Sequence, residues 1–293
     1  MAKARFFTQT KPQGFSLIEL VAVIVILGVL ATASVRFIVF GTQIYVEAND
    51  RQVVLSKSRF AIERMTREIR GAIPNSVRVS SSESCIEFTP IKASGAYRDD
   101  IDSVAAPVSP ETGNNMDVIG WLGDYQTGDR VYIYPTSSSD IYNSSSDKMG
   151  ILGDPLDSGA LPYTGISPQL NITFNPDPNF TEHSPKRRYY TADSSINYCL
   201  IANGVVYDLY RIVSTSFSAS QLQPSDKNAA TLLGGVLMAE GLTNNLSNDA
   251  THPFDISSST LNRNSVVNLY LEFKTNIDEN MFFNHEVHIP NVP

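Results

Sequence analysis

The chain has 293 residues, of which 42% are hydrophobic and 18% are charged, and its formal net charge is −8. This composition excludes general disorder and leaves room for one large domain or two ordinary ones. The acidic balance does not favour a nucleic-acid-binding protein, because such proteins usually carry a basic stripe. The two cysteines are too few for a zinc cluster at short spacing, so a single disulfide is the better interpretation in an oxidising compartment.

The amino-terminal region joins a cationic stretch to a long apolar one. The first 14 residues hold three cations and no acidic residue, and residues 15–35 are nearly all apolar, with Glu19 as their only charge. As a helix, the apolar run would be about 32 Å long, enough to cross the core of a bilayer. The cations are predicted to stay in the cytoplasm, which places the chain after Arg36 outside it.

Three interpretations of the apolar run compete. A secretory signal has a shorter apolar region that is followed by a small-residue cleavage site, and the nearest candidate here is Ala31-Thr32-Ala33. A simple membrane anchor fits the length but leaves Glu19 unexplained, because a carboxylate at this depth costs about 2.5–3.5 kcal/mol. The third interpretation, a precursor that is cut next to the apolar run, supplies a positive partner for that carboxylate.

The segment Gly14-Phe15-Ser16-Leu17-Ile18-Glu19-Leu20 resembles the type IV prepilin signature. The resemblance implies that residues 1–14 are a leader peptide, which an inner-membrane prepilin peptidase removes between Gly14 and Phe15. Phe15 then becomes a methylated amino terminus, and Glu19 becomes the fifth residue of the mature chain. The amine of a neighbouring subunit neutralises Glu19 in this family. Such a pair is strong at low dielectric because either charge alone is expensive there.

The helix is predicted to continue past the membrane as far as Ile73. Residues 15–35 form its transmembrane half and residues 36–73 its amphipathic half, with Gly41 as the one weak point and Pro74 as the stop.

The amphipathic half has one apolar face and one charged face. Apolar residues at helical spacing predict the buried face: Leu55, Ile62, Met65, Ile69 and Ile73. The charged face holds Lys57, Arg59, Arg64, Arg67, Glu68 and Arg70. Glu63 and Arg67 are spaced for an i,i+4 ion pair. We interpret the charged face as a solvated or subunit-facing surface rather than a DNA- or lipid-binding stripe.

After Pro74 the hydrophobic period changes from 3.6 to 2, which predicts a β-rich domain over residues 74–293. The predicted strands are 85–89 and 129–134, a hairpin over 198–212, and a last pair at 266–273 and 282–289. Asn203-Gly204 is predicted to supply both positive-φ positions of the hairpin turn. Polar stretches at 136–147, 175–188 and 243–260 are predicted to be surface loops.

Cys85 and Cys199 both fall in predicted strands. A disulfide between them would tie the strand after the helix to the central hairpin, and closing so long a loop is worth roughly 4–5 kcal/mol in the chain-entropy model. The alternative is a pair of buried free thiols.

The sequence gives little support for catalysis, a cofactor or a metal. It holds no phosphate-binding Gly-x-x-x-x-Gly-Lys and no Gly-x-Ser-x-Gly nucleophile motif. His285 and His288 are three residues apart in a predicted strand, so they point to opposite faces and do not share a metal. The acidic residues Asp99, Asp100 and Asp102 lack the calcium-loop pattern and are interpreted as a solvated loop. Trp121 is expected to be a core or anchoring residue.

Four later segments resemble the MshO-type minor pilins of the mannose-sensitive haemagglutinin (MSHA) pilus system. They are 58–68, 85–88, 198–200 and 283–293. The resemblance implies an α+β pilin-like fold, in which the long helix packs on a β-rich antiparallel sheet. It also implies a structural role in pilus biogenesis, at or near the filament tip, without enzymatic activity. A body of about 220 residues suits a minor subunit, because major pilins are usually shorter.

The resemblance implies a single-pass protein of the inner membrane, with its carboxyl-terminal domain in the periplasm, that enters an extracellular filament. Its partners would be the prepilin peptidase, other minor and major pilins, and the pilus assembly machinery. Without the leader, the chain has 19 basic and 30 acidic residues and a net charge of −11. The first alternative is a J-type minor pseudopilin of a type II secretion system. The second, from another class, is a membrane-anchored periplasmic enzyme or binding protein.

Overall fold

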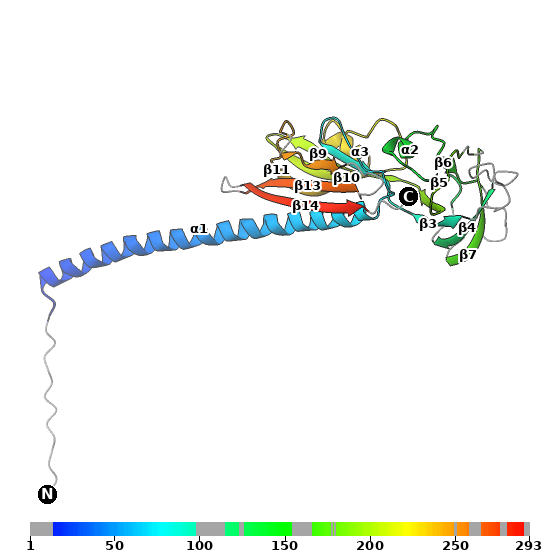
Figure 1. Ribbon diagram of the computed structural model, residues 1–293. Coiled ribbons are helices and arrows are strands. Elements are labelled where there is room, and N and C mark those ends of the chain that lie inside the picture. The colour runs from blue at the N-terminus through cyan, green and yellow to red at the C-terminus, as the bar shows by residue number, and fades with distance from the viewer. Residues whose placement is uncertain are drawn as a thin grey trace, which may run out of the picture. The chain divides into compact units, whose positions relative to one another are not determined.

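The computed structural model describes residues 14–97, 115–122, 126–153, 166–176, 178, 180–248, 251–257, 265–275 and 280–289. The chain divides into two compact units, Met1–Gln52 and Val53–Pro293. The first unit is helical from Leu17 onward. The second contains the rest of the same helix and a β-rich body (Figure 1).

Helix α1 (Leu17–Arg70) runs without interruption through both units, and Gly41 does not break it. The helix ends at Arg70, so the predicted end at Ile73 was wrong by three residues. The reason is that the chain after the helix pairs with other strands of the body. The N–H of Gly71 closes a tight turn, and the N–H of Ile73 donates to the carbonyl of Thr89 at 2.8 Å instead of continuing the helical ladder.

The larger sheet has eight antiparallel strands and receives the second half of α1. Its order is β1-β2-β9-β10-β11-β13-β12, and β14 pairs with β13 on the other side. The strands are β1 (Arg78–Val79), β2 (Cys85–Phe88), β9 (Ser195–Asn203), β10 (Val206–Ser214), β11 (Val236–Leu242), β12 (Phe254–Ser257), β13 (Ser265–Lys274) and β14 (Asn280–Ile289). One core cluster joins the helix to this sheet. The predicted α+β class, a long helix packed on an antiparallel β-rich domain, is therefore confirmed.

The helix buries a narrower stripe than the sequence predicts. Met65 and Ile69 are fully buried, as expected, whereas Leu55 and Ile62 are only half-buried. The remaining fully buried positions are the small residues Ser58 and Ala61. Small side chains let the helix backbone approach the sheet closely, and hydrophobicity alone does not mark such positions.

The central hairpin forms from β9 and β10, which pair along their full length. The turn differs from the predicted one. Asn203 is still in β9, opposite Val206, and the turn residues are Gly204 and Val205. Only Gly204 has a positive φ, 68°, which matches a two-residue turn that needs glycine at its first central position.

A second sheet of six antiparallel strands lies beyond the end of α1 in the body (Figure 1). Its order is β6-β5-β8-β3-β4-β7. The strands are β3 (Ala93–Tyr97), β4 (Asn115–Leu122), β5 (Arg130–Ile133), β6 (Met149–Ile151), β7 (Ile166–Thr173) and β8 (Arg188–Ala192). The sequence predicted only β5 among them, and the predicted single strand proves to be part of a separate layer with its own core.

Two of the predicted surface loops contain regular structure. The 136–147 stretch holds the short helix α2 (Ser138–Tyr142), and the 243–260 stretch holds β12. Tyr142 is fully buried, and its hydroxyl donates to the carbonyl of Ser76 at 3.0 Å. The polar stretch is therefore an anchored connection rather than a surface loop, because Ile141 and Tyr142 fill a core cluster together with β8 residues.

Candidate assembly site

Gly14 lies just before the first turn of α1 and is exposed. A Cβ atom built on it meets nothing within 4 Å, and its φ lies outside the left-handed region. The local fold therefore accepts a side chain at this position. A requirement for glycine here would come from a protein that reads the segment, not from the chain itself.

Ser16 caps the amino terminus of α1. Its hydroxyl accepts a hydrogen bond from the N–H of Glu19 at 3.3 Å, and its carbonyl accepts from the N–H groups of Glu19 and Leu20 at 3.1 and 3.2 Å. This places Glu19 in the first turn, where a carboxylate interacts favourably with the positive end of the helix dipole. The Ser16 and Glu19 spacing is that of a capping box.

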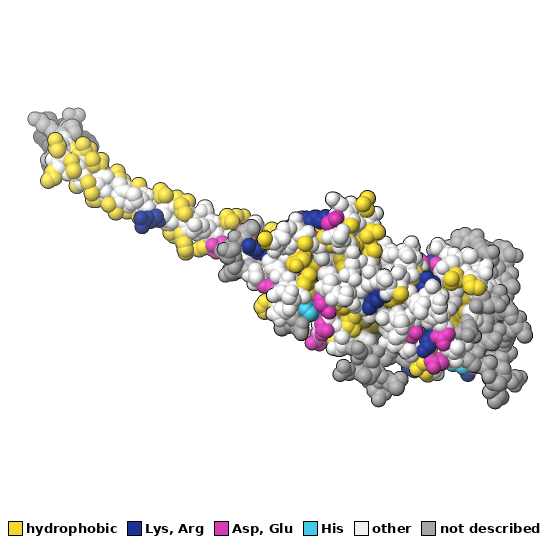
Figure 2. Space-filling view, turned by 90° about the horizontal axis from the view of Figure 1, so that it is seen from above, with side chains coloured by type: hydrophobic (Ala, Val, Ile, Leu, Met, Phe, Trp, Pro, Cys, Tyr) yellow, Lys and Arg dark blue, Asp and Glu magenta, His cyan; other side chains and the backbone are white. Residues whose placement is uncertain are grey.

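The first half of α1 is apolar on all sides. Its side chains from Leu17 to Phe40 are all exposed within the chain, and the helix is long and apolar enough to cross a membrane. Hydrophobic side chains cover its visible face (Figure 2). A helix that is apolar all round is stable in lipid or inside a bundle of similar helices, not in water. The apolar helix is compatible with membrane anchoring.

The second half of α1 is fixed to the larger sheet by Glu68, a partly buried carboxylate whose role the sequence did not reveal. Glu68 accepts hydrogen bonds from Arg211 Nε at 2.9 and 3.1 Å, from the Tyr198 hydroxyl at 2.8 Å and from Arg64 Nε at 3.1 Å. The predicted Glu63–Arg67 pair is replaced, within the described helix, by an i,i+4 pair between Arg64 and Glu68. The group joins α1 to β9 and β10.

The ionisation of this group follows from its contacts. Burial alone would raise the pKa of Glu68, but the hydrogen bonds from Arg211, Tyr198 and Arg64 outweigh it and hold the pKa below its ordinary value of 4.5. Burial, together with the neighbouring carboxylate, raises the pKa of the Tyr198 hydroxyl well above its ordinary value. Tyr198 therefore remains a protonated donor, and Glu68 remains a charged acceptor, at neutral pH.

The two cysteines face each other directly in the sheet. Cys85 of β2 and Cys199 of β9 are register partners, and they form a disulfide with Cα atoms 4.1 Å apart. Both side chains are buried in a cluster on the face opposite α1, next to β10 and helix α3 (Lys227–Leu232).

Where the structure describes them, the remaining candidate residues do not come together in a chemical site. His285 is half-buried on the helix side of β14, and His288 is exposed on the other face. In the described part of the chain, no group of three or more His, Cys, Asp or Glu residues is arranged to hold a metal ion. Trp121 is in β4, but its side chain lies outside the described residues, as do Asp99, Asp100 and Asp102.

Residues 10–35 match the model of the prokaryotic N-terminal methylation motif. This segment contains Gly14, Phe15 and Glu19, and it ends at the last residue of the predicted transmembrane half. No curated protein and no solved structure matches the chain significantly. The motif, together with the long apolar helix and the β-rich body, supports a type IV pilin-like or pseudopilin class of protein, with a structural role rather than an enzymatic one.

Proposed function

We propose that this protein is a minor pilin of an MSHA-type type IV pilus and takes part in pilus biogenesis at or near the filament tip. The observation that carries the proposal is the position of Glu19. It is a lone carboxylate in the first turn of an exposed apolar helix, inside the segment that matches the N-terminal methylation motif. Neither a secretory signal nor a simple anchor accounts for that carboxylate.

The first step is processing at the cytoplasmic edge of the membrane. The exposed Gly14 is accessible to a prepilin peptidase, which cuts the Gly14–Phe15 peptide bond and removes residues 1–14. The cut frees the α-amine of Phe15, which is then methylated. Because the fold itself accepts a side chain at Gly14, the glycine serves recognition by the peptidase.

The second step is the transfer of the helix from lipid into the filament. In the membrane, Glu19 lies one helical turn after Phe15 and is costly to bury alone. The α-amine of a neighbouring major or minor pilin neutralises it as the helices pack together. The pairing works only in the correct axial register, so the carboxylate selects that register while the apolar side chains supply the packing.

The body remains outside the membrane in this account. We assign residues 15–35 to the inner membrane and residues 74–293 to the periplasm, where the Cys85–Cys199 disulfide forms in an oxidising environment. The assembly machinery and the other pilins of the tip complex are the partners. Support for the minor role comes from the large body and from its four segments that are similar to MshO-type minor pilins.

The experiment compares Glu19→Ala with Glu47→Ala, which removes a carboxylate from the same helix outside the apolar run. We expect Glu19→Ala to reduce the amount of protein in the sheared filament fraction at least tenfold, with unchanged membrane insertion and leader removal. Glu47→Ala should assemble normally. Equal filament incorporation of wild type and Glu19→Ala would contradict the proposal.

The same methylation motif also favours a second function, a J-type minor pseudopilin of a type II secretion system. The two functions share the anchor, the helix and the processing step, so Glu19 does not separate them. Deletion of the gene does: loss of surface pili with normal protein secretion supports the pilus role, and the reverse supports the pseudopilin.

A further inference from the structure

Strand β14 is an open edge of the larger sheet. In the described part of the chain it pairs only with β13, through ten consecutive residue pairs from Asn280 to Ile289 without a bulge. Edge strands of this length are usually protected by proline, lysine or a bulge. Strand β14 has none of these, and Glu286 is its only acidic or basic residue apart from two histidines. Within the described residues no second strand pairs with it, which leaves its outer backbone groups available to another strand.

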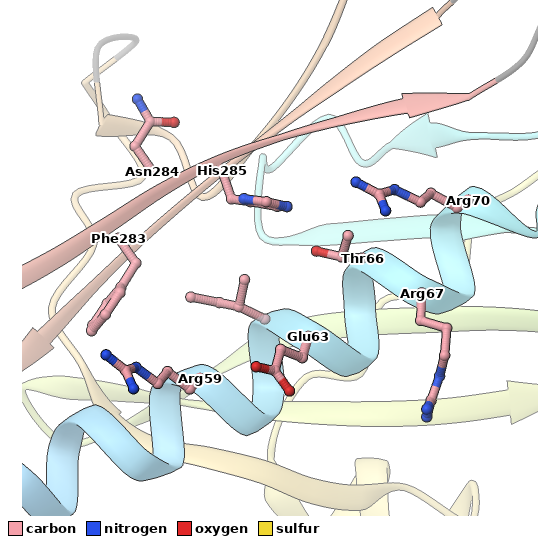
Figure 3. A pocket seen from close by; sticks show the side chains of 9 residues that line it. Arg59, Glu63, Thr66, Arg67, Arg70, Phe283, Asn284 and His285 are labelled. Atoms are coloured by element: carbon pink, nitrogen blue, oxygen red, sulfur yellow. The ribbon is translucent and has the colours of Figure 1, made fainter.

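A groove of about 700 Å³ lies between this strand and the second half of α1 (Figure 3). Its apolar lining comes from Ile62 of the helix and Phe283 of the strand, and Phe283 and His285 point from the strand toward the helix. The strand runs alongside α1, so the groove follows both elements (Figure 1). An extended segment that pairs with β14 would place alternate side chains in it.

The charge of the groove is opposite to that of the protein. Arg59, Arg67 and Arg70 line it together with a single carboxylate, Glu63, and the three arginines are exposed. Among the described residues, none of these three guanidinium groups takes part in an ion pair, whereas Arg64 and Arg211 both form ion pairs with Glu68. A cationic groove on a chain whose net charge is −8 favours an acidic ligand.

We propose that this groove binds an extended acidic segment of a partner protein, which adds to β14 as a further antiparallel or parallel strand. The inference rests on the proposed function, because the partner would be another subunit of the assembly. Arg59 and Arg70 are about 16 Å apart along the helix axis, which corresponds to about four or five residue steps of a strand, and four steps keep both acidic side chains on one face of it. The segment therefore carries carboxylates near both ends of a five-residue stretch and a neutral side chain opposite Glu63.

The test uses a labelled synthetic peptide, Val-Asp-Val-Thr-Val-Asp-Val, and the full-length protein in detergent micelles, with binding followed by fluorescence anisotropy. Three matched peptides accompany it. One has Asn in place of both Asp residues, one has Lys in their place, and one keeps the acids but carries an N-methyl group on every backbone amide, so that neither edge can donate a hydrogen bond. The last cannot pair with a strand, although its side chains are unchanged.

We expect the acidic peptide to bind at least tenfold more tightly than the other three, and we expect added salt to weaken it. Arg59→Gln and Arg70→Gln should each weaken binding at least threefold. Lys186→Gln, which removes an exposed cation outside the groove, should have no effect. The proposal would be overturned if the N-methylated or the Lys peptide bound as tightly as the acidic peptide. It would also be overturned if neither arginine substitution weakened binding. Groove-dependent self-association that excludes the peptide would identify a second copy as the occupant and overturn it as well.

This assay needs neither leader removal nor a filament. If the peptide fails to bind while Glu19 still controls assembly, only the acidic-strand inference fails. If the peptide binds while Glu19→Ala assembles normally, the acidic-strand inference is supported and the proposed function fails.

Discussion

The two halves of α1 belong to one continuous helix, but they are stabilised by different surroundings. Up to Phe40 its large apolar side chains are mostly more than half exposed within the chain, so its environment must come from lipid or from other helices. From Val53 to Arg70 the helix buries a narrow stripe and holds a charged group against the sheet. Substitutions in the first half should change assembly, and substitutions in the second half should change stability.

The largest expected effect on stability comes from the disulfide between β2 and β9. It lies on the face of the larger sheet opposite the second half of α1. Replacing both Cys85 and Cys199 by Ser should lower the free energy of unfolding by about 4–5 kcal/mol, because the bridge closes a loop with a sequence separation of 114. Urea unfolding of the full-length protein in detergent, without reductant, measures this. Labelling of unfolded wild type should find no reactive thiol, and two reactive thiols would contradict the bridge. Membrane insertion should be unaffected.

A matched pair of alanine substitutions compares the two halves directly. Met65 is fully buried between helix and sheet, whereas Leu27 is 57% exposed within the chain. Met65→Ala should lower the free energy of unfolding of the body by about 2–5 kcal/mol, because it removes core contacts and leaves a cavity. Leu27→Ala should leave it unchanged within about 0.5 kcal/mol. A comparable loss from both would show that the first half is also part of the folded core.

The Glu68 group makes the stability of the body depend on pH. Glu68→Gln should destabilise the body by about 2–3 kcal/mol at pH 7, because Arg211 and Arg64 lose their charged acceptor. Glu63→Gln, on the exposed side of the same helix, is the control. Because the pKa of Glu68 is lowered on folding, its contribution is present above its ordinary pKa of 4.5 and is lost as the pH falls through the lowered value. Urea unfolding should show a smaller difference in free energy of unfolding between wild type and Glu68→Gln at about pH 3 than at pH 7. An equal difference at both pH values would contradict this.

The smallest expected effect concerns the ion pair near the start of the docked half. Lys57 Nζ and Glu240 Oε2 are 3.5 Å apart, and both side chains are more than half exposed. Glu240→Gln should change the free energy of unfolding by less than about 0.5 kcal/mol, because solvent screens exposed pairs. A larger loss in the same urea experiment would mean that this pair fixes the junction between the two halves.

The sequence predicts the first half of α1 better than it predicts the body. Its signals are all local in the sequence: the cationic flank, the apolar run and the lone carboxylate. The candidate processing and assembly residues Gly14, Phe15 and Glu19 could therefore be named before the fold was known. Alternating patterns were also sufficient for β2, β5, the β9–β10 hairpin and the β13–β14 pair, all of which are confirmed.

The rest depends on contacts between distant parts of the chain. Most strands of the smaller sheet are rich in polar or small residues, as in Ala93–Tyr97, so their hydrophobic pattern is weak. Arg211 is 143 residues from Glu68, and no local spacing predicts that pair. The i,i+4 relation of Arg64 and Glu68 was available in the sequence, but the Glu63–Arg67 pair had the same spacing, and only packing against the sheet decides between them.

The mature amino terminus tests the central claim most directly. Mass spectrometry of protein from purified membranes and from sheared filaments should find a chain that begins at Phe15 and carries one added methyl group. A chain that begins at Met1, or one cut after Ala33 as a secretory signal would be, would contradict the account.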